Sequence, residues 1–184
     1  MAPIGIYIHV PFCRSKCPYC AFYSLIFTNR AADAYTQSMI KAIRNHPFGQ
    51  LKADTLYFGG GTPVLLAPDR LEKIILACKA TFGLDDSAEI TLEANPATAL
   101  STVLPALRKA GINRISFGVQ SFQTGELLSL GRRHSVTQAR RAIQDAKRAG
   151  FTDISADLLL AIPGQTPEGL AKSGEALALS LIHH

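Results

Sequence analysis

Short apolar runs alternate with amphipathic segments along the whole chain. An apolar run bounded by turn residues indicates a strand, and apolar positions that recur every three to four residues indicate a helix. The pattern predicts strands at 4–10, 55–58, 89–93, 112–118 and 154–160. It predicts helices at 31–44, from about residue 69, and at 101–110, 136–149 and 167–181. We expect Asp69 to cap the second helix, and Gly111 and Gly150 to end the third and fourth.

Strand-then-helix units with short connections predict parallel strands joined by right-handed crossovers, and hence a barrel or an open α/β sheet. The strands are apolar along most of their length, as in a parallel sheet that is covered by helices. In barrels of this kind the reactive side chains gather where the strands end and the βα loops begin. Several chemically distinctive segments of this chain fall at or just beyond such ends, so we expect them to form one shared site.

Three cysteines stand close together after the first expected strand, in the segment Cys13-Arg14-Ser15-Lys16-Cys17-Pro18-Tyr19-Cys20. Thiolates at this spacing can converge on one metal centre, but they supply three soft ligands rather than four. Structural zinc takes a closed set of four ligands, and a cubane iron–sulfur cluster is normally held by four thiolates. Three thiolates would leave one iron open to a small chelating ligand. The loop therefore indicates a reactive cluster site more than a structural staple.

Two other interpretations of the cysteines stay open. A disulfide within the loop would leave one thiol over and suits an oxidising compartment, whereas the chain starts with a strand pattern and no secretory segment. A zinc site would need His9 or a distant residue, because no second Cys or His pair follows at zinc-ligand spacing. Cys78 lies inside a helical pattern and is expected to be a buried apolar residue. We assign no metal to His9 or His134, since a lone histidine is more often structural.

Composition narrows the function classes. With 184 residues, 47% of them hydrophobic, the chain can bury one substantial core, so we expect one domain over 1–184. The net charge of +5 comes from 19 Lys and Arg against 14 Asp and Glu, without the aromatic-studded basic run of a nucleic-acid surface. The apolar runs are far shorter than the roughly 20 residues that span a bilayer. We expect a cytoplasmic protein without a transmembrane segment, with peripheral membrane contact left open.

The cysteine loop, with Tyr19 immediately before its third cysteine, resembles the signature of the radical S-adenosylmethionine (radical SAM) enzymes, whose loop holds a 4Fe-4S cluster. Further motifs occur in order along the chain. They are Tyr7-Ile8-His9-Val10-Pro11-Phe12-Cys13, Gly59-Gly60-Gly61-Thr62-Pro63, Leu92-Glu93-Ala94-Asn95-Pro96, Gly118-Val119-Gln120-Ser121-Phe122, Leu130-Gly131-Arg132-Arg133-His134 and Ile162-Pro163-Gly164-Gln165-Thr166. Together they resemble the group that contains the oxygen-independent coproporphyrinogen III oxidases and related haem chaperones.

The resemblance implies a fold and a set of ligands. The fold is a TIM-like (β/α)6 barrel, here partial after about five βα units. The cluster ligands are Cys13, Cys17 and Cys20, and SAM chelates the open iron. Contacts to SAM are implied for Tyr7, Tyr19, Gly60, Gly61, Thr62, Glu93, Gln120, Arg132 and Asp157. Members of the group continue into a sixth strand and a C-terminal domain, so we expect 1–184 to be an incomplete core domain with an unpaired, association-prone sheet edge.

The residue types suit these roles. The glycine triplet removes three side chains, so that backbone can approach a ligand closely. Glu93 follows an apolar run, where a buried acid must be paired or hydrogen-bonded. The guanidinium of Arg132 suits a carboxylate, either of the cofactor or of a propionate-bearing substrate. We expect Tyr7 to pack its ring in the core with its hydroxyl at the site, and Tyr19 to lie against the adenine.

Two functions follow from the resemblance. The radical chemistry that the resemblance implies begins when an electron donor reduces the cluster, which cleaves SAM to methionine and a 5′-deoxyadenosyl radical; the sequence leaves open whether SAM is turned over. The oxidases use a second SAM and convert two propionates of coproporphyrinogen III to vinyls; the chaperones bind haem and pass it to a haem-accepting respiratory protein. Phe22 stands where the oxidases carry a fourth cysteine, and Ala21 stands where the chaperones carry an aspartate. Phe22 favours the haem chaperone, with the oxidase and a non-catalytic metal-binding scaffold as alternatives.

Overall fold

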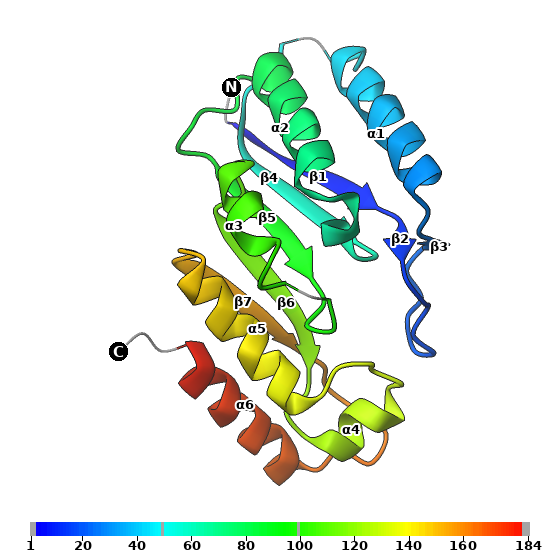
Figure 1. Cartoon of the computed structure of the whole chain (residues 1–184), viewed down its shortest axis with the longest axis vertical. Coiled ribbons are helices and arrows are strands. Elements are labelled where there is room, and N and C mark those ends of the chain that lie inside the picture. Colours follow the sequence, from blue (N-terminus) through cyan, green and yellow to red (C-terminus); the bar gives the residue numbers. More distant parts are fainter. Residues whose placement is uncertain (1–2, 49, 99, 182–184) are drawn as a thin grey trace.

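A five-stranded parallel sheet forms the centre of the computed structural model, which describes residues 3–48, 50–98 and 100–181 (Figure 1). Its strands are β1 (Ile4–Val10), β4 (Ala53–Gly60), β5 (Glu89–Ala94), β6 (Arg114–Gln120) and β7 (Asp153–Leu158). They lie in the order β1-β4-β5-β6-β7, so spatial order follows chain order, and every pairing is parallel. The predicted partial barrel of strand-then-helix units is confirmed. In the part of the chain described, β1 and β7 form the two edges.

The helices lie along one face of this sheet, except for the short helix Thr124–Ser129, which lies beyond the carboxyl end of β6 (Figure 1). They are α1 (Asn29–Arg44), α2 (Pro68–Phe82), α3 (Leu104–Lys109), α4 (Thr124–Ser129), α5 (Val136–Arg148) and α6 (Pro167–Leu181), with a short 3₁₀ helix η1 (Pro63–Leu66). The five predicted helices correspond to α1, α2, α3, α5 and α6. Side-chain caps define the starts of α1 and α5. The Thr28 hydroxyl accepts a hydrogen bond from the Ala31 amide at 3.1 Å, and Ser135 and Gln138 form a capping box.

Side chains alternate strictly across the sheet. Buried apolar residues point towards the helices, and they include Leu56, Phe58, Ile90, Leu92, Ile115 and Phe117. The residues between them point to the opposite face, and they include Tyr57, Thr91, Glu93, Arg114, Ser116 and Asp157. The expectation of strands that are apolar along most of their length is therefore wrong for this second face. It is polar, because helices cover only one side of the sheet.

Hydrogen bonds tie the polar face together across three strands. The Arg114 guanidinium donates to Thr91 Oγ1 and Ser155 Oγ, both at 3.3 Å, and pairs with Asp153 at 3.3 Å. The Ser155 hydroxyl donates to Ser116 Oγ at 3.0 Å. These bonds satisfy polar groups that would otherwise be costly to bury.

Several predicted boundaries are wrong for local reasons. Asp69 is not the cap of α2, because the helix begins at Pro68 after Ala67, whose φ is 68° and whose side chain cannot accept a hydrogen bond. Asp69 lies in the first turn, where its negative charge interacts favourably with the positive end of the helix dipole. The third helix begins at Leu104, since 101–103 form a turn. Gly111 and Gly150 have positive φ values, and each directly follows the residue that caps its helix, so both end their helices as expected.

Candidate functional site

The three loop cysteines line one cavity of about 480 Å³ at the carboxyl ends of the strands. All of the other predicted site residues except Tyr7 line it as well. They are Tyr19, Gly60, Gly61, Thr62, Glu93, Gln120, Arg132 and Asp157. These side chains come from segments far apart in the sequence and meet because parallel strands end at the same edge. We call this space the main cavity.

The cysteine loop is anchored at both ends. Its first end is β2 (Phe12–Cys13), which pairs in parallel with β3 (Leu25–Ile26). The Phe12 ring is 2% exposed and packs edge-on against Phe27 and Tyr35. Inside the loop the Cys20 amide donates to the Cys17 carbonyl at 3.1 Å. Anchoring of this kind holds the thiols towards the main cavity.

The donor set fits an iron–sulfur cluster better than a single ion. Cys13, Cys17 and Cys20 are free thiols of intermediate exposure. Among the described residues, no three His, Cys, Asp or Glu side chains gather closely enough to hold one metal ion. A zinc ion requires all its sulfur ligands at about 2.3 Å from one point, whereas a cluster distributes its thiolates over separate irons. Cys78 is fully buried in α2, and burial raises the pKa of its thiol to about 12.

Gly60 and Gly61 are required by packing as well as by the cavity. A Cβ on Gly61 would lie 2.6 Å from the Phe12 carbonyl oxygen and 3.0 Å from Cys13 Sγ. Gly60 has a φ of +111°, and a Cβ there would lie 2.6 Å from the His9 ring. The Gly61 amide donates to the Val10 carbonyl at 2.9 Å. The absence of side chains at the glycines thus lets the end of β4 pack directly against β1 and the cysteine loop. From the sequence we considered only the approach of a ligand and did not predict this packing role.

Glu93 is a half-buried carboxylate with two donors. Tyr57 donates to its Oε1 at 2.8 Å, and the Gly60 amide donates to its Oε2 at 3.1 Å. Burial raises the pKa of Glu93, and these two hydrogen bonds oppose the rise. Burial likewise raises the pKa of Asp157, and a hydrogen bond from Ser116 opposes it. The main cavity therefore holds two acids that gain from a cationic ligand.

Arg132 connects the cysteine loop to β6. Its Nη1 lies 3.9 Å from Cys17 Sγ and 3.3 Å from the Tyr19 hydroxyl, and its Nη2 donates to the Gly118 carbonyl. Burial raises the pKa of Tyr19, while the nearby Arg132 charge opposes this rise.

Gln120 ends β6 in a conformation that is unusual for its type. Its φ is 71°, and the β6–β7 register shifts between Phe117 and Gln120. A non-glycine residue in the left-handed region costs about 1 kcal/mol or more, and such residues concentrate at binding sites. This backbone places the Gln120 side chain on the main cavity.

Tyr7 does not lie where we expected. Its ring is 58% exposed rather than packed in the core, because β1 is an edge strand and Tyr7 points to the polar face. It stacks on Tyr57 with 6.0 Å between ring centroids, and its hydroxyl lies 3.2 Å from His9 Nδ1. Tyr7 therefore touches the residue that donates to Glu93 without lining the main cavity itself.

The two histidines have structural partners. His9 Nε2 lies 3.1 Å from the Tyr23 carbonyl oxygen. His134 is 3% exposed, with Nε2 at 3.1 Å from the Val119 carbonyl oxygen. Burial lowers the pKa of His134 to about 4, so its ring is neutral at pH 7. Neither histidine lines the main cavity.

A family model decides what this arrangement is. The model of the Radical SAM superfamily matches residues 7–177, which include the cysteine loop and every strand end that lines the main cavity. The chain belongs to the radical SAM superfamily. Members of this superfamily use a 4Fe-4S cluster and SAM. No helix in the described part of this radical SAM chain is long and apolar enough to cross a membrane.

Relatives within the superfamily are similar over nearly the whole chain. The haem chaperone HemW of Lactococcus lactis is 37% identical and covers 98% of this chain, and HemW of Escherichia coli is 36% identical and covers 100%. The coproporphyrinogen III oxidase HemN of Escherichia coli, a radical SAM enzyme, superimposes with a TM-score of 0.85 over 97% of this chain at 29% identity. The chain spans 48% and 50% of the two HemW proteins and 42% of the HemN chain.

Sequence reasoning missed some residues of the radical SAM site. Asn95, Gly118 and Leu159 line the main cavity, and so does Phe22, which we had considered only as a replacement for a cysteine. Asn95 directly follows β5, so its place after a strand end was a usable signal. Gly118 contributes its carbonyl to Arg132, and a backbone role of that kind leaves no trace in residue type.

Proposed function

We propose that Cys13, Cys17 and Cys20 hold a 4Fe-4S cluster with one open iron, and that SAM binds in the main cavity. The support is the convergence of three free thiols on a cavity that also holds two acids and a guanidinium. When bound, the cluster and SAM supply a radical that abstracts hydrogen. The protein's own residues bind, orient and shield these groups.

The residues suggest distinct roles towards SAM. Glu93 is oriented by Tyr57 and Gly60, so its carboxylate can accept a hydrogen bond from the amino group of SAM. Gly61 and Thr62 offer backbone groups and one hydroxyl at the loop. Tyr19 offers a ring face to the adenine, worth on the order of 1 kcal/mol beyond area burial if the rings stack.

The remaining contacts complete the proposed SAM site. Gln120 and Asp157 offer an amide and a carboxylate from neighbouring strands. Arg132 places one cation near the cysteine loop. Tyr7 acts through Tyr57, on which it stacks, rather than by lining the cavity.

We propose that the protein is a haem chaperone, which binds haem and transfers it to a haem-dependent respiratory protein. One observation carries this assignment: Phe22 occupies the position of the oxidases' fourth cysteine, and it lines the main cavity with 62% of its surface exposed. A phenyl ring cannot ligate iron, but it offers an apolar surface to a tetrapyrrole. The 36–37% identity with HemW chaperones agrees with it.

The alternative is an oxygen-independent coproporphyrinogen III oxidase. It is favoured by the TM-score of 0.85 with HemN of Escherichia coli, which is a coproporphyrinogen III oxidase. In either case the protein needs an electron donor for its cluster. We also propose a cytoplasmic location, since partly exposed thiols that must stay reduced suit a reducing compartment.

The test is an anaerobic product analysis of the natural full-length protein. The cluster is reconstituted and its content is verified by absorption before coproporphyrinogen III, SAM and a strong reductant are added. A parallel titration with haem measures binding, followed by transfer to a haem-free acceptor protein. We expect haem binding and transfer without decarboxylated porphyrinogen. Decarboxylation at a rate proportional to cluster content would instead establish the oxidase.

A further inference from the structure

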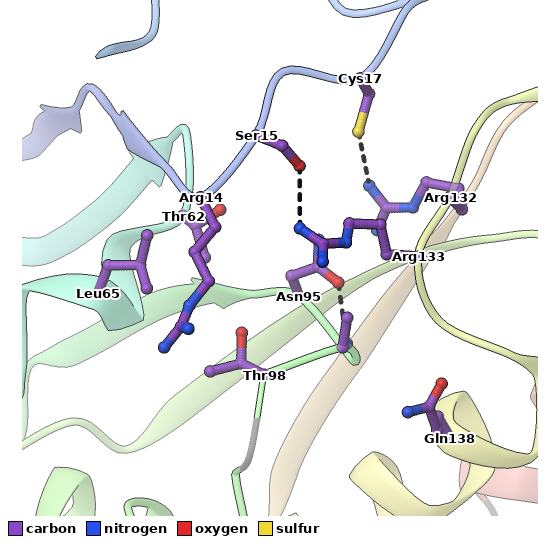
Figure 2. Close-up of a pocket in the computed structure, with 11 residues that line it drawn as sticks. Arg14, Ser15, Cys17, Thr62, Leu65, Asn95, Thr98, Arg132, Arg133 and Gln138 are labelled. Atoms are coloured by element: carbon purple, nitrogen blue, oxygen red, sulfur yellow. Dashed lines mark hydrogen bonds between the residues drawn. The ribbon is translucent and has the colours of Figure 1, made fainter. Parts of the chain in front are cut away.

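A second cavity of about 340 Å³ lies beside the cysteine loop (Figure 2). Arg14, Arg132 and Arg133 all line it, and no described Asp or Glu does so. Of the loop cysteines only Cys17 reaches it, whereas all three line the main cavity. We call this second space the side chamber. It adjoins the proposed SAM site, with Arg132 between the two, but most of its basic wall belongs to neither the cluster nor SAM.

The guanidinium groups of the side chamber have donors to spare. Arg133 Nη1 donates to Ser15 Oγ at 3.5 Å, and no hydrogen bond or ion pair of Arg14 occurs within the described residues. The buried Nε of Arg132 has no hydrogen-bond partner. A guanidinium carries five N–H donors, so most of this capacity is unused. In Figure 2 the Arg14 side chain extends from the loop in the direction of Thr98.

The surroundings reinforce the positive potential. Gln138, in the first turn of α5, lines the side chamber, so the positive end of that helix dipole lies beside it. Hydroxyls of Ser15 and Thr98 add neutral donors. Three cations without a facing carboxylate repel one another unless an anion joins them. The chemistry of the walls therefore selects a negatively charged group.

We propose that the side chamber binds a propionate carboxylate of the tetrapyrrole. This inference rests on the proposed function, because haem supplies the carboxylate. Arginine binds carboxylates in a bidentate fashion, and Arg14 and Arg133 approach the chamber from two different segments of the chain. The chamber volume suits a propionate arm, so the macrocycle itself lies outside it.

The test compares two ligands and three proteins. The cluster-reconstituted wild type, an R14Q/R133Q double variant and R44Q are titrated with haem and with haem dimethyl ester, which lacks free carboxylates. Arg44 is an exposed arginine in the last turn of α1 and serves as the matched control. We expect the double variant to bind haem about tenfold more weakly than the wild type. R44Q should match the wild type, and the ester should bind wild type and double variant equally.

Each other outcome has a definite meaning. Equal haem affinity in all three proteins overturns the propionate site and leaves the haem chaperone standing. Failure of the wild type to bind haem overturns both proposals. SAM affinity is measured in parallel, and loss of SAM binding in the double variant would assign the side chamber to SAM instead. Circular dichroism and cluster absorption confirm that the double variant is folded and loaded.

Discussion

Burial of the Glu93 carboxylate is unfavourable by itself, but the same carboxylate can bind a cationic ligand. Its pKa is raised because burial penalises the charged form more than Tyr57 and Gly60 stabilise it. A cationic amino group beside it would remove that imbalance. The same reasoning applies to Asp157, whose pKa is raised by burial. The burial of these two acids therefore weakens the fold slightly at neutral pH, and a cationic ligand such as the proposed SAM would recover the difference.

A pH dependence follows for the cluster-free, SAM-free protein. Since the folded pKa of Glu93 is above its ordinary value of 4.5, its contribution to stability is present below about pH 4.5 and is lost as the pH rises through the folded pKa. We expect the free energy of unfolding of the wild type, relative to E93Q, to fall with rising pH in that window. Urea denaturation at a series of pH values measures it, with E72Q on the exposed side of α2 as the control. A relative stability that rises with pH would contradict the assignment.

The cysteines give a second prediction. We expect Cys17→Ser to lose the absorption of the cluster, because a hydroxyl is a poor ligand for iron. Cys78→Ala should keep that absorption, since Cys78 is fully buried in α2. The free energy of unfolding of this variant should fall by about 1 kcal/mol. Anaerobic reconstitution followed by iron and sulfide analysis measures both. Equal iron content in the two variants would remove Cys17 from the ligand set.

Element by element, the long periodic segments were predictable, whereas among the short helices only α3, which Gly111 follows, was predicted. The helices α1, α2, α5 and α6 have enough turns for a clear apolar repeat. β2 and β3 have two residues each and α4 has six, so no periodicity can reveal them. They form through tertiary contacts, such as the bond from the Phe27 amide to the Cys13 carbonyl at 3.0 Å.

The residues that line the main cavity were easier to predict from the sequence than the bounds of the strands and helices that carry them. Glu93, Gln120 and Asp157 could be located because polar residues at the ends of apolar strands must meet at one edge. Tyr7 could not, because its exposure depends on β1 being an edge strand, a property of the whole sheet. The packing role of Gly61 depends on the loop that returns over it, which spacing alone does not show.

The junction of β4 with the cysteine loop can be tested by adding one methyl group. Gly61→Ala should cost about 1–3 kcal/mol and reduce cluster occupancy, since the new Cβ meets the Phe12 backbone. Gly174→Ala is the matched control in α6, where a Cβ meets no atom within 4 Å, and it should raise stability by about 0.5–1 kcal/mol. Chemical denaturation and iron analysis report both effects. Full iron occupancy in Gly61→Ala would contradict the tight junction.

For the molecule as a whole, cofactor binding and stability are coupled. SAM at 100 times its Kd should raise the free energy of unfolding of the cluster-loaded protein by about 2.7 kcal/mol, or about 5–10 °C in Tm. The cluster-free protein should show a smaller increase in Tm at the same SAM concentration, because the open iron that SAM would chelate is missing. Anaerobic thermal melts measure both. Equal shifts with and without the cluster would place SAM away from the cysteines.

The alternation of side chains across the sheet separates two tasks that many proteins combine in one set of residues. Apolar side chains such as Phe58, Leu92 and Phe117 meet the helices and supply the folding energy. Their neighbours along each strand form the polar face, and Glu93 and Asp157 of that face line the main cavity. Selection can therefore exchange the cavity-lining residues of the polar face while the protein continues to fold, provided that the hydrogen bonds of Arg114 are kept. A sheet built in this way can adopt new substrates without first becoming unstable.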